Sequence, residues 1–206
     1  MLIGIDFDNT IVDYDALFHK VALEQGVITS AVGATKLAVR DHLRAAGKED
    51  VWTEMQGYVY GARMAEAAMY PGVLEFFCWA SDKRIDLAII SHKTRHPFLG
   101  PKYDLHDAAR AWVLACLVYK GSCVVDPRNV YFELTKEEKI QRILQAGCDV
   151  FLDDLPEILL MEGFPAATMR VLFDPEGHHS TIDGMRTVRS WADFQREVSV
   201  QCQIRL

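Results

Sequence analysis

The chain has 206 residues, of which half are apolar and a quarter are charged, so it fits one folded domain with room for a small insertion and is neither disordered nor fibrous. Its 22 lysines and arginines against 29 acidic residues give a net charge of −7. A charge of that sign argues against binding nucleic acid or an anionic membrane across a broad face, although a local basic pocket remains compatible with it.

The amino-terminal run is the first predicted strand and shows no sign of a targeting segment. Asp6 and Asp8 interrupt it too early for a signal peptide, and no stretch approaches the ~18–20 apolar residues that span a membrane. The five cysteines are odd in number and contain no CxxC pair, which predicts reduced thiols rather than disulfides or a zinc site. We therefore expect a cytoplasmic protein without a membrane partner.

Along most of the chain, short apolar runs alternate with longer amphipathic ones. The apolar runs predict strands over residues 1–6, 86–90, 129–133, 150–152 and 169–173. The amphipathic runs predict helices over residues 74–81, 105–119, 136–146, 155–162 and 191–198, the last with Ser190 as its N-cap. Strands separated by helices predict a parallel sheet with right-handed crossovers, and hence a doubly wound α/β domain.

The interval between the first two strands breaks this alternation. Residues 13–85 contain no convincing strand, and they predict helices over 16–25, 35–46, 52–57 and 62–69. Gly26 and Gly47 stand where helices should end. We therefore expect a core of residues 1–13 and 70–206, with a small helical unit of residues 14–69 inserted after the first strand.

Polar residues capable of chemistry follow four of the predicted strands. In a parallel sheet, ligands bind at the carboxyl ends of the strands, so these side chains are expected to converge. They are Asp6 and Asp8 after the first strand, Ser91 after the second, Lys136 and Lys139 in the helix after the third, and Asp153 and Asp154 after the fourth.

Each of these residues also has a purely structural interpretation. Asp8 and Asn9 are typical turn residues, Ser91 fits a loop hydroxyl, and the two lysines fit a solvated helix face. Asp154 fits the N-cap of the following helix. Asp6 is harder to explain in this way, because a charge at the end of an otherwise apolar strand is costly to bury. The joint occurrence of all of them favours a functional site.

The residue types fit phosphate chemistry. Converging carboxylates repel one another and need a hard cation, and oxygen ligands suit Mg²⁺. A carboxylate can attack a phosphoryl group to give an aspartyl phosphate, and a second Asp two residues later can act as general acid and base. A hydroxyl and a lysine would hold and neutralise the transferring oxygens. The sequence therefore predicts a site for a phosphate group.

This set of motifs resembles the haloacid dehalogenase (HAD) superfamily over residues 1–12 and roughly 70–175. The first family motif, an apolar strand that ends in DxDxT, is present as residues 6–10. The second, an apolar strand that ends in Ser or Thr, ends here at Ser91. The resemblance implies a HAD-like Rossmannoid core of three layers, with a small helical cap inserted after the first strand.

The remaining two family motifs lie later in the chain. The fourth, an acidic pair after an apolar strand, is present as Asp153 and Asp154. The third is a single lysine upstream of that pair, for which we prefer Lys139 and retain Lys136 as an alternative.

The resemblance also implies roles for the acidic residues. Asp6 would be the nucleophile and Asp8 the general acid and base. Mg²⁺ would be held by the Asp6 side chain, the backbone carbonyl of Asp8 and Asp153, with Asp154 binding it directly or through water. Dehalogenase members lack the second Asp of the first motif, so this chain is similar to the phosphatase branch.

The family places a cap, which closes over the site and selects the substrate, where this chain has its helical unit. Five cations of the unit are candidates for facing the substrate, and the sequence does not rank them: Lys20, Lys36, Arg40, Arg44 and Arg63. The segment 92–102 contains three further cations, two histidines and no acid, and it fits either a basic surface loop or a loop that contacts an anionic substrate. The candidate substrate-binding residues outside the unit are Thr10, His92, Lys93, Arg95 and Lys136.

We therefore expect a Mg²⁺-dependent phosphomonoester hydrolase that acts on a small phosphorylated metabolite through phospho-Asp6, with no nucleic-acid partner. A phosphomutase with the same residues is one alternative. A catalytically idle HAD-like domain that binds or regulates a partner is another. The particular substrate and the oligomeric state are open at this point.

Overall fold

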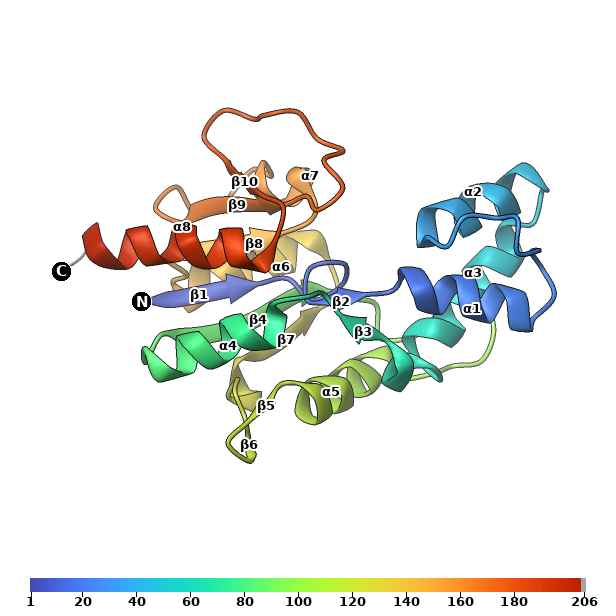
Figure 1. Ribbon diagram of the computed structural model, residues 1–206, viewed down its shortest axis with the longest axis horizontal. Helices are drawn as coiled ribbons and strands as arrows, with labels where there is room; N and C mark the ends of the chain where they lie inside the picture. Colours follow the sequence, from blue (N-terminus) through green and yellow to red (C-terminus); the bar gives the residue numbers. More distant parts are fainter. Residues whose placement is uncertain (205–206) are drawn as a thin grey trace.

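The computed structural model describes residues 1–204 and is built around a six-stranded sheet whose neighbouring strands are all parallel (Figure 1). In spatial order the strands are β10 (Arg186–Val188), β9 (Met169–Phe173), β8 (Val150–Asp153), β1 (Leu2–Ile5), β4 (Asp86–His92) and β7 (Val130–Glu133). Because β1 lies between β8 and β4, the carboxyl ends of these three strands are neighbours. The parallel sheet with helices on both faces confirms the predicted α/β fold.

Side chains of the strands alternate between two helical layers. One layer consists of α4 (Val73–Asp82), α5 (Leu105–Cys116) and α8 (Trp191–Ile204), and the other of α6 (Lys136–Ala146) and α7 (Pro156–Leu159). On β4, Leu87 and Ile89 belong to the apolar core of the first layer, whereas Ala88 and Ile90 belong to that of the second. Burial on both faces explains why the strands consist of continuous apolar runs.

Most predicted core elements are present, with differences at their ends. β9 and α6 have the predicted bounds, whereas α7 is a short helix that ends at Leu159. The Ser190 hydroxyl accepts a hydrogen bond from the Asp193 amide at 3.1 Å, which fits the predicted N-cap of α8. β10 is a strand that the sequence did not predict, because two of its three residues are exposed and leave no apolar run. The remaining short elements of the core are β5 (Val118–Tyr119), β6 (Ser122–Cys123) and η2 (Pro127–Asn129).

The chain between β2 (Val12–Asp13) and β3 (Ala68–Met69) forms a helical unit at the carboxyl end of the sheet (Figure 1). Its elements are α1 (Asp15–Glu24), α2 (Lys36–Ala45), α3 (Glu49–Tyr60) and the short 3₁₀ turn η1 (Met64–Glu66). β2 and β3 pair antiparallel. The predicted helix over 62–69 is therefore wrong at residues 68–69, and the prediction of no strand between residues 13 and 85 is wrong as well. Strands of two residues are too short to leave a periodic pattern. The division into residues 14–69 and a core stays a prediction.

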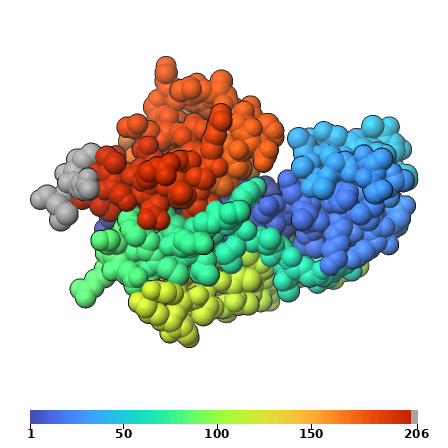
Figure 2. Space-filling model, in the orientation of Figure 1, coloured from blue at the N-terminus to red at the C-terminus, as the bar shows by residue number. Residues whose placement is uncertain are grey.

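The helical unit is tied to the core away from the β2–β3 pair. A Cβ atom built on Gly57 of α3 would lie 2.6 Å from Cβ of Pro97, which shows how closely this helix packs on the segment after β4. Nε1 of Trp112 in α5 donates to the carbonyl of Ala67 at 2.9 Å. On the other side, Figure 2 shows a notch between the unit (blue) and the carboxyl-terminal part of the core (orange).

The cysteines and the helix lengths bear on two further expectations. All five cysteines are free, as predicted. Cys148 is buried, and the other four are partly exposed. Among the described residues, no helix combines the length and the apolar content that crossing a membrane requires.

Candidate active site

The loop that follows β1 carries the predicted nucleophile. The Asp6 amide donates to the Leu152 carbonyl at 2.9 Å, which extends the pairing of β1 with β8 by one residue. The chain then turns back, because the carbonyl of Phe7 accepts a hydrogen bond from the Val12 amide at 3.0 Å and Asn9 adopts a left-handed conformation with φ of 56°. Asparagine tolerates this conformation better than most residues. Asp6 is thereby fixed at the edge of the sheet and is almost fully buried.

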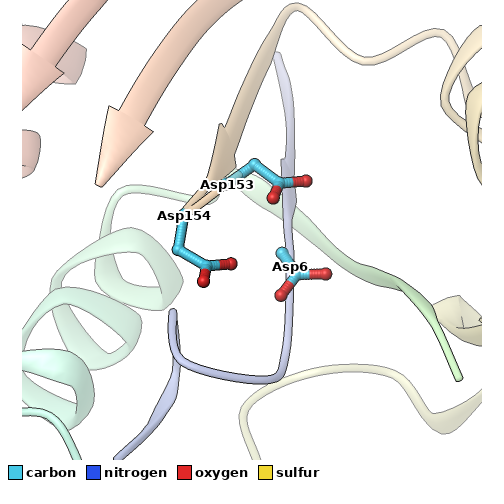
Figure 3. Close-up of side chains that lie close together, drawn as sticks. All are labelled: Asp6, Asp153 and Asp154. Atoms are coloured by element: carbon cyan, nitrogen blue, oxygen red, sulfur yellow. The ribbon is translucent and has the colours of Figure 1, made fainter. Parts of the chain in front are cut away.

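Three carboxylates converge at this edge. One oxygen from each of Asp6, Asp153 and Asp154 lies within 4.8 Å of the other two. Figure 3 shows the carboxyl groups of Asp6 and Asp154 turned toward each other, with Asp153 beside them at the end of β8. Oδ1 of Asp153 accepts a hydrogen bond from the Leu155 amide at 3.0 Å, and Leu155 is the N-cap of α7. The interpretation of Asp154 as that N-cap is therefore wrong.

A buried lysine links two of these carboxylates. Nζ of Lys139 lies 2.5 Å from Oδ1 of Asp6 and 2.6 Å from Oδ2 of Asp153, and its side chain is 2% exposed. Lys136, one turn earlier in α6, is 41% exposed and pairs with Glu157 at 3.4 Å. The structure thus brings Lys139, and not Lys136, to the acidic cluster.

Ser91 completes the surroundings of Asp6. It lies near the end of β4 and is almost fully buried, and its hydroxyl donates to Oδ1 of Asp6 at 2.8 Å. The same oxygen accepts from Lys139. Two donors from β4 and α6 therefore orient the carboxylate of Asp6.

The electrostatics of the cluster favour a bound cation. Three carboxylates face one ammonium group, and burial together with Asp153 raises the pKa of Asp6 to about 7, although Lys139 lowers it. Burial and the charges of Asp6 and Asp153 also raise the pKa of Asp154. Carboxylate oxygens at this spacing fit a hard divalent cation such as Mg²⁺, which would offset the repulsion.

Asp8 lies in a second ionic group beside this cluster. Nζ of Lys93 lies 2.8 and 2.7 Å from its two carboxylate oxygens, and the hydroxyl of Tyr14 donates to Oδ1 at 2.5 Å. Burial alone would raise the pKa of Asp8, but the charge of Lys93 and these hydrogen bonds lower it below its ordinary value. The side chain is therefore a well-paired carboxylate. The metal contact through its backbone carbonyl stays a prediction.

The other residues predicted to bind substrate have protein partners. The hydroxyl of Thr10 donates to Asp154 at 3.5 Å, Nε2 of His92 lies 3.0 Å from the carbonyl of Leu134, and the exposed Arg95 pairs with Asp104 at 2.9 Å. The expected positive charge of segment 92–102 is largely compensated, because Asp8 neutralises Lys93 and Asp104 neutralises Arg95. Both acids lie outside the segment in sequence. A role for these residues in substrate binding stays a prediction.

Two further residues reach the site from the helical unit. Tyr14, which contacts Asp8, belongs to no motif and was missed in the sequence. Nζ of Lys36 donates to Oδ1 of Asn9 at 3.2 Å. The sequence included Lys36 among five cations without ranking it, because only the packing of α1 against α2 shows which of them points inward.

Comparison with known proteins identifies the fold. No family model and no curated protein matches the chain. A haloacid dehalogenase-like hydrolase from Streptococcus pneumoniae matches with a TM-score of 0.61 at 13% identity, over 96% of this chain and 97% of that one. A HAD family hydrolase from Deinococcus radiodurans R1 with bound phosphate and sodium matches with a TM-score of 0.60 at 13% identity, over 96% and 94%. A predicted phosphoglycolate phosphatase from Haemophilus somnus 129PT matches with a TM-score of 0.55 at 14% identity, over 96% and 97%. The chain therefore has the fold of the HAD-superfamily hydrolases, as its motifs implied.

Proposed function

We propose that this protein is a Mg²⁺-dependent phosphomonoester hydrolase that transfers the phosphoryl group of a small phosphorylated metabolite first to Asp6 and then to water. The observation that carries the proposal is the contact of the buried Asp6 carboxylate with Ser91 and Lys139, next to Asp153 and Asp154. A nucleophile, a fixed positive charge and a cation site supply the positioning and neutralisation that phosphoryl transfer needs. The shared fold with a hydrolase that holds bound phosphate supports the same function.

Asp6 is the residue that we propose attacks phosphorus. Its carboxylate oxygen would form a bond to phosphorus while the ester P–O bond breaks, which gives phospho-Asp6 and releases the alcohol part of the substrate. Ser91 and Lys139 orient the carboxylate, and they would contribute a hydroxyl and a positive charge to the transferring oxygens.

Asp8 is the residue that we propose moves the proton. It would take a proton from the water that attacks phospho-Asp6 in the second step and give that proton to the leaving oxygen in the first step of the next turnover, so that an alcohol and inorganic phosphate are released. Lys93 and Tyr14 hold the carboxylate form that the second step requires. Because they also lower the pKa of Asp8, we expect esters with good leaving groups to react faster.

Mg²⁺ is the cation that we propose for the acidic cluster. Asp6, Asp153 and Asp154 would hold it together with the backbone carbonyl of Asp8. When bound, it would neutralise the carboxylates and the phosphoryl oxygens. All side chains of the cluster are carboxylates, and such ligands favour Mg²⁺ over zinc.

Release of inorganic phosphate from an aryl phosphate in the presence of Mg²⁺ tests this function. We expect Asp6→Asn to abolish release and Asp8→Ala to lose most of it, with circular dichroism unchanged. Asp82→Asn alters an exposed aspartate in α4 and is the matched control that keeps the wild-type rate. Normal turnover by the Asp6 variant would refute the nucleophile. Transfer to another hydroxyl without phosphate release would identify a phosphomutase, and inactivity across a panel of phosphate esters would favour a binding domain.

We also infer a cytoplasmic protein that takes small molecules rather than nucleic acid. The net charge of −7, the compensated basic segment 92–102 and the five free thiols support this inference. The oligomeric state stays open.

A further inference from the structure

Lys36 is the one of the five candidate cations considered above that has no acidic partner at its charged group among the residues that the structure describes. Four of the five cations considered above form ion pairs within the unit: Lys20 with Glu66, Arg40 with Asp41, Arg44 with Glu49, and Arg63 with Glu24. Among the residues that the structure describes, no carboxylate lies within ion-pair distance of Nζ of Lys36. Lys36 donates instead to the neutral side chain of Asn9 at 3.2 Å. Its positive charge is therefore directed at the site without being neutralised by an ion pair.

Aromatic rings hold this ammonium group in place. Nζ of Lys36 lies 5.9 Å from the ring centre of Tyr14, 5.7 Å from that of Phe18 and 5.6 Å from that of Tyr60. The rings attract the ammonium group through the negative charge of their faces. Such contacts stabilise a cation without cancelling its charge, so the group is still able to bind an anion.

The position of Lys36 points to the leaving group rather than to the phosphoryl group. Its partner Asn9 directly follows Asp8, which would protonate the leaving oxygen. Burial lowers the pKa of Lys36, but Tyr60, Asp8 and Asp154 raise it by more, so the side chain is an ammonium group at neutral pH. The ring of Tyr14 lies 5.9 Å from Nζ of Lys36 and its hydroxyl donates to Asp8 at 2.5 Å, so Lys36 lies on the side of the site that holds Asp8.

Two other lysines near the site show by contrast what is particular about Lys36. Lys93 lies 4.8 Å from the ring centre of Tyr60, but Asp8 neutralises it through contacts with both carboxylate oxygens. Lys139 is occupied by the acidic cluster, where the transferring phosphoryl group would lie. Of these three lysines, Lys36 is the one whose charge is not paired with a carboxylate, so it is available to another part of the substrate.

We propose that Lys36 binds a second anionic group on the leaving-group part of the substrate, so that the protein selects phosphomonoesters that also carry a carboxylate or a further phosphate. The proposal rests on the proposed function, which places the phosphoryl group at Asp6 and the leaving group at Asp8. An arriving anion would replace the hydrogen bond to neutral Asn9 by a charge-assisted one, which is stronger. An ammonium group acts as a point charge, so it suits either anion.

Two pairs of phosphate esters, each with a shared carbon skeleton, probe this preference. In the first pair, 3-phosphoglycerate differs from glycerol 3-phosphate by a carboxylate. In the second, glucose 1,6-bisphosphate differs from glucose 6-phosphate by a phosphate. Calorimetry in the Asp6→Asn background with Mg²⁺ gives dissociation constants without turnover, and kcat/KM in the wild-type background gives the same comparison during catalysis.

In at least one pair, we expect the member with the second anionic group to be preferred by about tenfold, which corresponds to about 1.4 kcal/mol. Lys36→Met should remove that preference, because it removes the charge-assisted contact. Lys36→Arg keeps the charge and should keep most of the preference. The matched control is Arg40→Met, which removes a paired cation one turn later in α2. Whichever pair responds identifies the anion as a carboxylate or a phosphate. A ratio that is the same in the Lys36→Met variant and its parent, for both pairs, would overturn the proposal.

Thermal unfolding of each variant establishes that it is folded, and the arginine variant keeps the comparison informative if the methionine variant does not fold. The two proposals fail in different ways. If the esters with a second anionic group bind preferentially but no ester releases phosphate, the hydrolase function is refuted and the anion-binding role of Lys36 is retained. Hydrolysis of both members with equal binding and equal kcat/KM would refute the anion contact and leave the hydrolase standing.

Discussion

Removal of Lys139 is the sharpest test of how the acidic cluster is held together. The side chain is 2% exposed and lies 2.5 and 2.6 Å from two carboxylates that are themselves buried. In the metal-free protein, Lys139→Met leaves Asp6 and Asp153 without their shared cation. Breaking a buried ion pair in this way costs about 3–5 kcal/mol. For a chain of this length 1 kcal/mol shifts Tm by about 2–4 °C, so we expect Tm to fall by roughly 6–20 °C.

Lys136→Met is the matched control because it removes a lysine from the preceding turn of the same helix. That lysine is 41% exposed and pairs with the 55% exposed Glu157 at 3.4 Å. An exposed pair of this kind contributes about 0–1 kcal/mol, so we expect little change in Tm. The difference in Tm between the two variants would therefore show which of the two lysines holds the acidic cluster together.

Thermal and urea unfolding followed by circular dichroism, each with a chelator and with Mg²⁺, measure the effect. We expect Mg²⁺ to restore part of the loss in the Lys139 variant, because the cation supplies positive charge to the same carboxylates. If that variant does not fold, the double variant Asp153→Asn/Lys139→Met should be the more stable of the two, because it buries one charge fewer. Equal stabilities of the two single lysine variants without metal would refute this account of the cluster.

Three further predictions follow from the geometry. In metal-free protein the pKa of Asp6 is raised to about 7, so the folded state loses stability as pH rises through that value and Asp6 becomes charged. Bound Mg²⁺ offsets this charge, so the increase in Tm that Mg²⁺ causes should be larger at pH 8 than at pH 6. Equal increases at the two pH values would contradict the raised pKa. Lys93→Met should lower the free energy of unfolding by about 1.5–3 kcal/mol at neutral pH, because Asp8 loses a charged hydrogen-bond donor. The pKa of Asp8 is lowered, so this loss should shrink as pH falls below the ordinary value of 3.8, and a loss independent of pH in urea unfolding would count against the pair. Gly57→Ala should lower Tm, because the new methyl group would lie 2.6 Å from Cβ of Pro97. At an exposed helix position the same substitution would stabilise the helix by about 1 kcal/mol. A higher Tm would therefore show that the contact with Pro97 relaxes.

The sheet, and the acidic residues at its carboxyl edge, were predictable because strands buried on both faces are continuous apolar runs in the sequence. Each central strand is an apolar run, and the residue at which the run stops is the residue at the edge of the sheet. This rule found Asp6, Ser91 and Asp153 from chain order alone. It did not find β10 or the β2–β3 pair, which are short and partly exposed.

The partners of the predicted residues were not predictable in the same way. Lys93 and Asp8 lie 85 positions apart and meet because β1 and β4 are neighbours in the sheet. The sequence places Lys93 in a segment without acids, whereas the fold supplies its acid from another strand. For the same reason, Lys36 differs from the other cations of its unit only once α2 has packed beside α1.

The contact of α3 with Pro97 has a consequence for motion. A unit joined to its core by only one pair of strands could rotate as a rigid body. Here α3 also packs on Pro97 in the segment after β4, and the carbonyl of Ala67 accepts a hydrogen bond from Trp112 in α5. α2 packs on α1 and α3 within the unit. We therefore expect α3 to stay in place on the core while α2 moves, with amide hydrogen exchange faster in α2 than in α3. Because α2 carries Lys36, opening would withdraw its charge from the site, and release of the alcohol product would be coupled to that movement.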